Sequence, residues 1–223
     1  LPLKKKRKMK RTDPLVRKRC REMFGDEWWK TDKKKRQDDA ITYLNKYLST
    51  SNTRNTQEDI NALYKIVSSK IPRAKHIKIE TLNPSRKCYE VMRELMKSGT
   101  EHRWLFHGTT AAAVPLICRD GFNRSFCGRN ATVYGNGVYF TSDINYSAQN
   151  IYSVPDDKHI KRIFAASVLV GHTCQGRSGQ ITPDVCNNIM CDSTVDNVKN
   201  PSIYVIYKDF QAIPEYLISF TMD

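Results

Sequence analysis

The chain has 223 residues and a formal net charge of +14, with 37 Lys and Arg against 23 Asp and Glu. Its hydrophobic share of 39% is low but suffices for one globular domain with an appendage. No stretch approaches the roughly 20 apolar residues of a membrane-spanning helix, and no apolar segment typical of a signal peptide follows the basic start. These features exclude a membrane-spanning class, and we expect a soluble protein.

The cysteines indicate the compartment. There are seven, an odd number without paired spacing: Cys20, Cys88, Cys118, Cys127, Cys174, Cys186 and Cys191. Such a set is typical of reduced thiols in the cytosol or nucleus rather than of a secreted disulfide framework. We therefore expect an intracellular protein, located in the nucleus or alternatively in the cytoplasm.

The positive charge is concentrated at the N-terminus. Residues 1–36 contain sixteen Lys and Arg against five acidic residues, so residues 37–223 carry only about +3. The run Lys4 to Arg11 repels itself and suits a nuclear import receptor or a polyanion. A solvated tail without a role is the alternative, and the salt dependence of binding would distinguish the two.

The rest of this arm contains one apolar segment and one expected helix. Trp28 and Trp29 form an aromatic pair that is either a partner site or a local contact with the domain's own surface. Helical spacing of apolar residues predicts a helix over 32–48. The Ser/Thr/Asn-rich stretch 49–56 then separates an N-terminal arm, residues 1–50, from a domain at 57–223.

The domain begins with helical patterns and continues with strands. The predicted elements, in chain order, are a helix at 57–69, a strand at 76–81, a helix at 83–98, a strand ending at His107, a helix at 110–118, a polar loop at 122–132, a strand at 137–141, a helix at 143–150, and strands at 162–170, 202–208 and 216–220. Strands dominate the second half without regular helical crossovers. This order excludes a doubly wound parallel sheet and favours an α+β fold.

Two strand ends deliver polar side chains between glycines. The segment 104–109 ends in His107 and Gly108, and the segment 134–140 contains Gly135, Gly137 and Tyr139. Glycine in or beside a strand often marks a close approach by a backbone or a ligand. These ends therefore predict a cleft whose floor offers bare peptide groups to a flat, polar ligand.

Several motifs in order carry a resemblance to a known family. They are His107-Gly108-Thr109, Gly121-Phe-Asn-Arg124, Tyr134-Gly-Asn-Gly-Val-Tyr139-Phe140, Tyr146-Ser147-Ala148, the segment 192–197, the segment 201–207 and Gln211-Ala-Ile-Pro-Glu-Tyr-Leu-Ile218. Over residues 57–223 the chain resembles the catalytic domain of the poly(ADP-ribose) polymerase family. The likeness is greatest to members that transfer one ADP-ribose, the macrodomain-linked type among them. It implies an ADP-ribosyltransferase fold, with a split, mostly antiparallel sheet and flanking helices.

The resemblance also implies NAD as co-substrate and a role for each matched residue. Gly108 is similar to the glycine that offers its N–H and C=O to nicotinamide, with Ser147 adding a third hydrogen bond. Tyr152 resembles the tyrosine that stacks on the ring, and Tyr139 lines the other side toward the nicotinamide ribose. His107 resembles the histidine that holds the adenosine ribose. Thr109, Tyr146, and Arg124 and Gly128 of the loop expected over the adenosine and pyrophosphate complete the predicted NAD-binding set.

Each of these residues taken alone has a structural interpretation. His107 or Tyr139 would be a core residue of a strand, Gly108 a turn, and Ser147 a helix cap. Their joint order favours the NAD site. The remaining alternative is a catalytically silent relative that binds RNA, another polyanion or NAD.

One position departs from the polymerising members. Those members place a glutamate in the strand after Asn200-Pro201, whereas this sequence has no carboxylate there before Asp209. Alignment puts Ile203 at that position, or Tyr204 if a one-residue bulge intervenes. His107, Tyr139 and Ile203 then form the predicted catalytic set. The absence of a base for elongation implies transfer of a single ADP-ribose to protein acceptors, the protein itself among them.

Four residues have the chemistry of zinc ligands. His172, Cys174, Cys186 and Cys191 lie within twenty residues, but their spacing matches no common zinc motif. We therefore expect no metal.

Overall fold

The computed structural model describes residues 56–96, 101–126, 132–186 and 188–223, with residues 32, 34, 35, 38, 39 and 42. The chain divides into two compact units, Leu1–Asn52 and Thr53–Asp223. In the first unit, the described residues 34, 35, 38, 39 and 42 are helical, and the Lys35 N–H donates to Asp32 Oδ1 (2.9 Å). The rest of the predicted helix, the Lys4 to Arg11 run and the Trp28-Trp29 pair lie outside the described residues.

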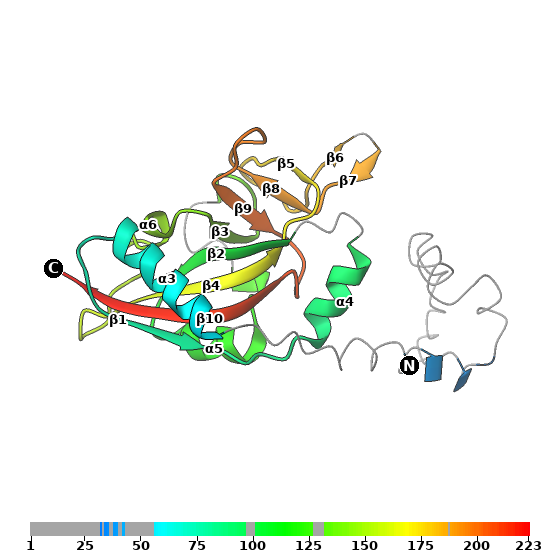
Figure 1. Cartoon of the computed structure of the whole chain (residues 1–223). Helices are drawn as coiled ribbons and strands as arrows, with labels where there is room; N and C mark the ends of the chain where they lie inside the picture. Colours follow the sequence, from blue (N-terminus) through cyan, green and yellow to red (C-terminus); the bar gives the residue numbers. More distant parts are fainter. Residues whose placement is uncertain are drawn as a thin grey trace, which may run out of the picture. The chain divides into compact units, whose positions relative to one another are not determined.

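The second unit is built on one sheet of eight strands (Figure 1). Its elements are α3 (Thr56–Lys70), β1 (Ala74–Thr81), α4 (Lys87–Leu95), β2 (Glu101–Thr109), α5 (Val114–Asp120), η2 (Arg124–Phe126), β3 (Val138–Thr141), α6 (Ile144–Ser147), β4 (Lys161–Leu169), β5 (Thr173–Gln175), β6 (Val185–Cys186), β7 (Ile189–Met190), β8 (Ser193–Val195), β9 (Ile203–Ile206) and β10 (Ala212–Met222). The strand order is β1-β10-β4-β2-β3-β9-β8-β5, and β6 and β7 form a separate pair. None of the described helices is long and apolar enough to cross a membrane.

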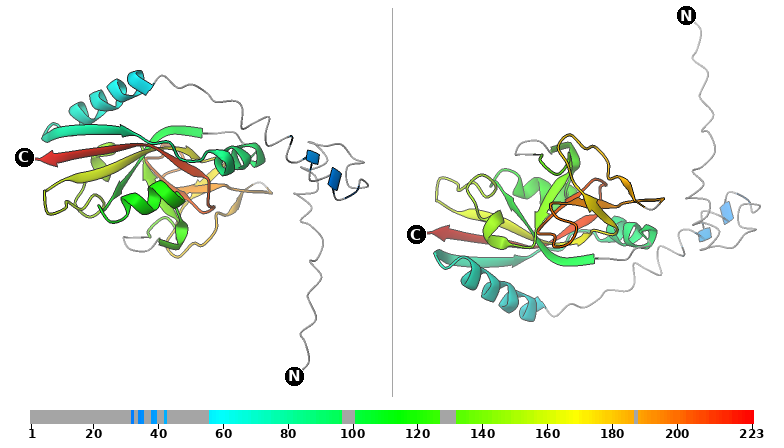
Figure 2. Two further views of the ribbon diagram at one scale, coloured as in Figure 1. Left: turned by 90° about the horizontal axis from the view of Figure 1, so that it is seen from below. Right: turned by 90° about the horizontal axis from the view of Figure 1, so that it is seen from above.

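Alternation along β4 fixes two cores, one on each face of the sheet. Ile163 and Ala165 pack with the α3 side chains Leu63 and Val67, whereas Phe164 belongs to the core that α5 covers. Successive strand residues point to opposite faces, so the consecutive apolar residues 163–166 of β4 serve both cores. Figure 2 shows α3 and α5 on opposite sides of the sheet.

The sheet is divided near its middle. β2 and β3 share a single residue pair, Phe106 with Thr141, whereas β2 and β4 pair over eight. The halves β1-β10-β4-β2 and β3-β9-β8-β5 are therefore joined at one point. All strand pairs are antiparallel except β5 with β8. The predicted α+β fold with a mostly antiparallel sheet is confirmed.

Some predicted elements differ in extent. The helix expected from residue 83 begins at Lys87, and the helix expected from residue 110 begins at Val114, after a turn. The short strands β5 to β8 were not predicted, because their two or three residues each carry no alternation that sequence can show. The partner of β5 is β8, about twenty residues further along, so only the folded sheet defines that pair. The strands β6 and β7 pair with each other in a hairpin.

Candidate active site

The separation of β2 from β3 is bridged by a side chain. Beyond the Phe106 and Thr141 pair the backbone ladder stops, and His107 Nδ1 instead lies 2.8 Å from the Tyr139 carbonyl oxygen. A carbonyl oxygen only accepts hydrogen bonds, so Nδ1 carries the hydrogen. In the neutral ring, Nε2 is then left as an acceptor.

Aromatic rings enclose this imidazole. Phe122 lies edge-on to it with centroids 5.3 Å apart, and Phe140 is tilted against it at 5.5 Å. Burial lowers the pKa of His107 below its ordinary value of about 6.5, and the bond to Tyr139 opposes this only in part. His107 is therefore neutral at neutral pH.

A cavity of about 450 Å³ opens where the two strands separate. This volume lies in the usual range for small-molecule and cofactor sites. Its lining includes eight of the ten residues predicted for the site: His107, Gly108, Thr109, Tyr139, Tyr146, Ser147, Tyr152 and Ile203. The structure thus brings together in one pocket residues that span almost 100 positions of the chain.

Gly108 is the position where the pocket tolerates no side chain. A Cβ there would lie 2.3 Å from the Ser147 carbonyl oxygen and 2.8 Å from the Tyr152 Cβ. Real Cβ atoms essentially never approach backbone this closely. Glycine at this point allows β2 to pass directly beneath α6 and the turn after it.

Two tyrosines form one wall. The rings of Tyr146 and Tyr152 stack with centroids 5.0 Å apart and an interplanar angle of 28°, and their hydroxyl oxygens are 2.7 Å apart. Burial and this hydrogen bond raise the pKa of Tyr146. The wall is therefore uncharged and flat, which suits stacking against a planar heterocycle.

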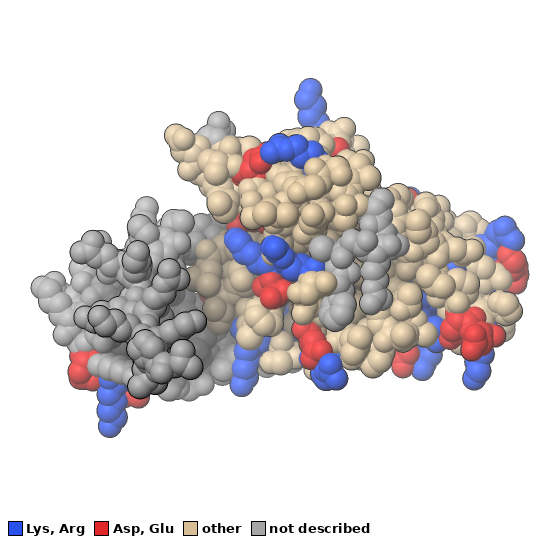
Figure 3. Space-filling view, turned by 180° about the vertical axis from the view of Figure 1, so that it is seen from behind, with Lys and Arg blue, Asp and Glu red and all other residues tan. Residues whose placement is uncertain are grey.

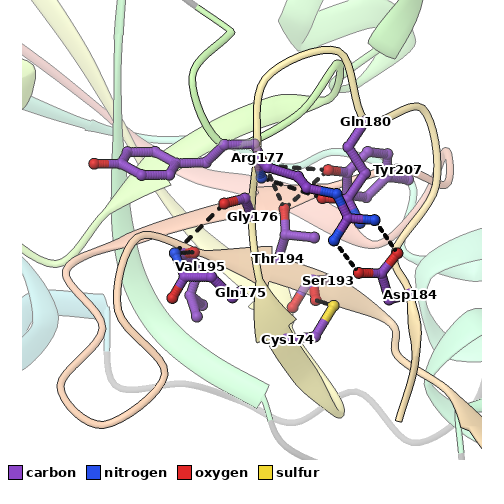
Figure 4. Close-up of polar contacts among 11 residues, drawn as sticks. Cys174, Gln175, Gly176, Arg177, Gln180, Asp184, Ser193, Thr194, Val195 and Tyr207 are labelled. Atoms are coloured by element: carbon purple, nitrogen blue, oxygen red, sulfur yellow. Dashed lines mark hydrogen bonds and ion pairs between the residues drawn. The ribbon is translucent and has the colours of Figure 1, made fainter.

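Tyr139 is fixed by its own turn. Its hydroxyl accepts from the Tyr134 N–H and donates to the Gly135 carbonyl, both at 2.9 Å. Thr194 supports the same turn by donating to the Tyr134 carbonyl at 2.7 Å, and its hydroxyl lies 2.9 Å from that of Tyr207 (Figure 4). The Tyr139 ring is thus held as a rigid part of the lining.

Ser147 is buried at the end of α6 and lines the pocket. The cap of this helix is Asp143, whose side chain accepts from the Asn145 N–H at 3.0 Å. Asp143 and not Ser147 therefore caps the N-terminus of α6, and Ser147 lies in its last position, against the pocket.

The strand β9 carries both candidates for the position of the polymerases' glutamate, Ile203 and Tyr204, and only Ile203 lines the pocket. Ile203 pairs with Thr141 and lines the pocket, whereas the next residue, Tyr204, belongs to the core and packs on His102. Alternation along β9 places the two side chains on opposite faces. Asp120 is the one carboxylate among the described lining residues, and Arg119 holds it through bonds of 2.7 and 2.9 Å.

Comparison with known proteins identifies the family. Residues 48–222 match the family model of the poly(ADP-ribose) polymerase catalytic domain. The chain belongs to the poly(ADP-ribose) polymerase family. The resemblance drawn from its motifs is confirmed.

Two curated relatives are similar in sequence. The human protein mono-ADP-ribosyltransferase PARP14 is 39% identical over 171 residues, which are 70% of this chain and 10% of that protein. The mouse protein mono-ADP-ribosyltransferase PARP10 is 36% identical over 177 residues, 75% of this chain and 18% of that protein. The chain therefore spans between a tenth and a fifth of the length of these relatives.

A solved structure shares the fold. The PARP domain of Arabidopsis RADICAL-INDUCED CELL DEATH1 superposes with a TM-score of 0.59 at 15% identity, covering 73% of this chain and 98% of that one. At this identity the likeness shows the architecture alone.

Two predicted site residues are not part of the described pocket. The Arg124 guanidinium donates to the Tyr207 carbonyl at 3.0 Å, and Arg124 does not line the cavity. Gly128 lies outside the described residues. The polymerase-family loop that contains both is thus described only as far as residue 126.

The pocket also includes residues that sequence reasoning did not select. Tyr134, Leu116, Val133, Ile151 and Val154 line it, and all but Tyr134 are substantially exposed. Tyr134 is the first residue of the recognised motif at 134–140, so the sequence alone could have indicated it as a site residue. The aliphatic residues lie in loops and on a helix surface, where no periodicity marks them.

The partly buried His107 predicts a pH dependence of stability. Its pKa is lower in the folded chain than unfolded, so the unfolded chain binds more protons below about pH 6.5. We expect the free energy of unfolding to fall by up to about 1.4 kcal/mol per pH unit as the pH drops below 6.5. Urea unfolding between about pH 7.5 and pH 5.5 measures this slope.

The variant His107→Gln is the control, because its amide keeps a donor for the Tyr139 carbonyl but cannot titrate in this range. We expect it to lose this part of the slope. An equal slope in both proteins would show that His107 is not held in its neutral form.

Proposed function

We propose that this chain is an NAD-dependent protein mono-ADP-ribosyltransferase, which transfers one ADP-ribose from NAD to a protein side chain and releases nicotinamide. The observation that supports this most is the convergence of Gly108, Ser147, Tyr152 and His107 in one pocket beside the aliphatic Ile203. The relatives named above are mono-ADP-ribosyltransferases, which agrees with the proposal.

The nicotinamide end of NAD fits the inner wall of this pocket. A carboxamide needs both a donor and an acceptor, and the peptide groups of Gly108 and the hydroxyl of Ser147 supply both kinds. Because Gly108 has no side chain, Ser147 and Tyr152 can lie directly against its backbone, which keeps these groups together in the pocket. Tyr152, already stacked on Tyr146, provides the face against which that ring would lie.

The ribose end fits His107. Its Nδ1 is used by the Tyr139 carbonyl, so Nε2 is the acceptor available to a ribose hydroxyl. The His107 imidazole has little freedom to reorient, because it is hydrogen-bonded to the backbone through Nδ1 and packed against two aromatic rings. His107 would thus fix the extended dinucleotide without moving a proton.

The reaction breaks the bond between the nicotinamide nitrogen and the ribose carbon. The electron pair leaves with nicotinamide, which becomes neutral, and the ribose acquires oxocarbenium character until the acceptor's nucleophilic oxygen attacks. An acceptor carboxylate needs no base, because it carries no proton to lose. The pocket contributes by positioning and by excluding water.

Ile203 restricts the product. Chain growth requires a hydroxyl of a bound ADP-ribose to be activated as nucleophile, and an aliphatic side chain can neither accept its proton nor orient it. The single carboxylate among the described lining residues, Asp120, is already paired with Arg119. Transfer therefore stops after one ADP-ribose.

The proposed role of the arm is separate from this chemistry. On the face in Figure 3, basic and acidic side chains of the described residues are interspersed. The excess of positive charge lies in residues 1–36 of the sequence. We assign nuclear import or polyanion binding to the Lys4 to Arg11 run, with the nucleus as the location.

Labelling with NAD tests the proposed activity. Purified protein incubated with labelled NAD and an acceptor extract should give discrete bands, each shifted by one ADP-ribose, with release of nicotinamide. His107→Ala should reduce labelling at least 100-fold, whereas His159→Asn, at an exposed position outside the pocket, should keep it. A polymer ladder would contradict single transfer. Absence of label with the unaltered protein would favour a silent binding module.

The variant Gly108→Ala tests how much the absence of a side chain at this position contributes to NAD binding. Gly108→Ala should weaken binding of a non-hydrolysable NAD analogue more than tenfold, about 1.4 kcal/mol, because the new methyl group would occupy space needed by Ser147 and Tyr152. Titration calorimetry measures this affinity.

The matched control is Gly121→Ala, at a glycine that also lines the pocket but whose Cβ would meet nothing within 4 Å. Its φ of +75° adds backbone strain of about 1 kcal/mol, so it should lower stability and leave affinity within about twofold. Equal losses of affinity in both variants would exclude the steric explanation for Gly108.

A further inference from the structure

Three cysteines from separate short strands and loops within residues 174–191 converge at one edge of the sheet. The Sγ atoms of Cys174, Cys186 and Cys191 all lie within 4.8 Å of one another. Cys174 is in β5, Cys186 is in β6, and Cys191 directly follows β7 and lies two residues before β8. None of the three lines the pocket described above.

The cysteine cluster lies in a part of the sheet that few other interactions stabilise. β5 is the edge strand, and the hairpin of β6 and β7 pairs only with itself and extends away from the sheet (Figure 1). Val185, Ile189 and Met190 of this hairpin are 53–61% exposed, so apolar packing does not fix it. A two-stranded hairpin alone is marginally stable in water, and a link between Cys186 and the sheet would stabilise it.

The three thiols suit a metal ion better than a covalent link. A disulfide would use two of them and leave the third beside it. A tetrahedral zinc ion with Zn–S bonds of about 2.3 Å places its sulfur ligands about 3.8 Å apart. The observed cluster reaches that spacing with shifts below about 1 Å, so all three thiols can be ligands together.

Backbone groups hold two of these cysteines in place. The Cys191 N–H donates to the Asp184 carbonyl at 2.9 Å, and the backbone N–H of Asp184 bonds the Cys174 sulfur. In turn, both terminal nitrogens of Arg177 donate hydrogen bonds to the Asp184 carboxylate, at 2.5 and 2.8 Å (Figure 4). Such outer contacts orient metal ligands, and Arg177 supplies positive charge near a thiolate centre.

We propose that Cys174, Cys186 and Cys191 form a structural site for a thiophilic divalent cation, zinc, with water or a small ligand in the fourth position. Binding converts three thiols to thiolates and releases three protons for each zinc ion. Spacing along the chain argued against a metal, and the proposal rests instead on the sheet, which brings β5 and the β8 approach side by side. His172 is not part of this cluster.

The site would also support the pocket from behind. The segment between β5 and β6 contacts the turn that carries Tyr139, because the Asn136 N–H donates to the Gln180 carbonyl at 2.7 Å. At Gly176, a Cβ would lie 2.4 Å from the Tyr134 carbonyl oxygen, so the two segments are in direct contact. A metal that fixes residues 174–191 therefore restrains this wall.

Metal analysis of the full chain tests the site. Protein purified under reducing conditions and loaded with zinc alone should retain about one equivalent after dialysis. Cys186→Ser and Cys191→Ser should each lose more than 90% of it, and Cys88→Ser, at an exposed cysteine on α4, should lose none. Cobalt loaded in place of zinc should give the intense thiolate charge-transfer and d–d bands of a tetrahedral site.

Thermal unfolding provides a second readout that does not depend on activity. A chelator should lower the melting temperature of the unaltered protein and leave that of Cys186→Ser unchanged. Because Cys186 is exposed, this variant is expected to fold, and circular dichroism checks that. Failure of the reduced protein to retain zinc, or retention by Cys186→Ser, would overturn the proposal.

Discussion

The site depends on one constraint, the end of the β2 and β3 ladder after a single residue pair. Two antiparallel strands that kept pairing would close the sheet and leave no cavity. Here the His107 side chain donates a hydrogen bond to the Tyr139 carbonyl. The two strands therefore stay linked while their backbones separate. Backbone groups along the separated edges lack the ladder partners that strands normally provide. A polar ligand can satisfy such groups, which supports the proposed NAD site at this opening.

Packing beneath the opening keeps it from closing. Phe122 stacks edge-on against Phe140 at 4.9 Å and against Phe164 at 5.9 Å, and His107 lies against the first two rings. Because β4 supplies apolar side chains to both faces, α3 and α5 hold it from both sides. The half β1-β10-β4-β2 thus carries Gly108, and the half β3-β9-β8-β5 carries Tyr139 and Ile203. The site lies at their junction.

The features that could be predicted from the sequence are those determined by short, contiguous segments. The glycine-flanked ends at His107 and Tyr139 predicted a cleft, and the order of strands predicted an α+β fold. The choice between Ile203 and Tyr204 could not be made, because it depends on the register of β9 against β3. The helix expected from residue 83 begins at Lys87, because residues 82–86 have no regular secondary structure.

Contacts formed between distant segments were the least predictable. Arg124 was expected beside the cavity, but its guanidinium instead donates a hydrogen bond to the carbonyl of Tyr207, 83 residues further along the chain. The three cysteines likewise have no local signature, and the edge strands alone bring them together. In both cases the partner is set by sheet topology rather than by neighbouring residues.

A crystal structure with nicotinamide bound tests the central claim most directly. We expect the carboxamide on the Gly108 peptide and Ser147, the ring against Tyr152, and the backbone ladder of β2 and β3 still limited to the pair Phe106 and Thr141. Nicotinamide bound elsewhere, or a β2 and β3 ladder that continues past His107 and closes the cavity, would contradict it.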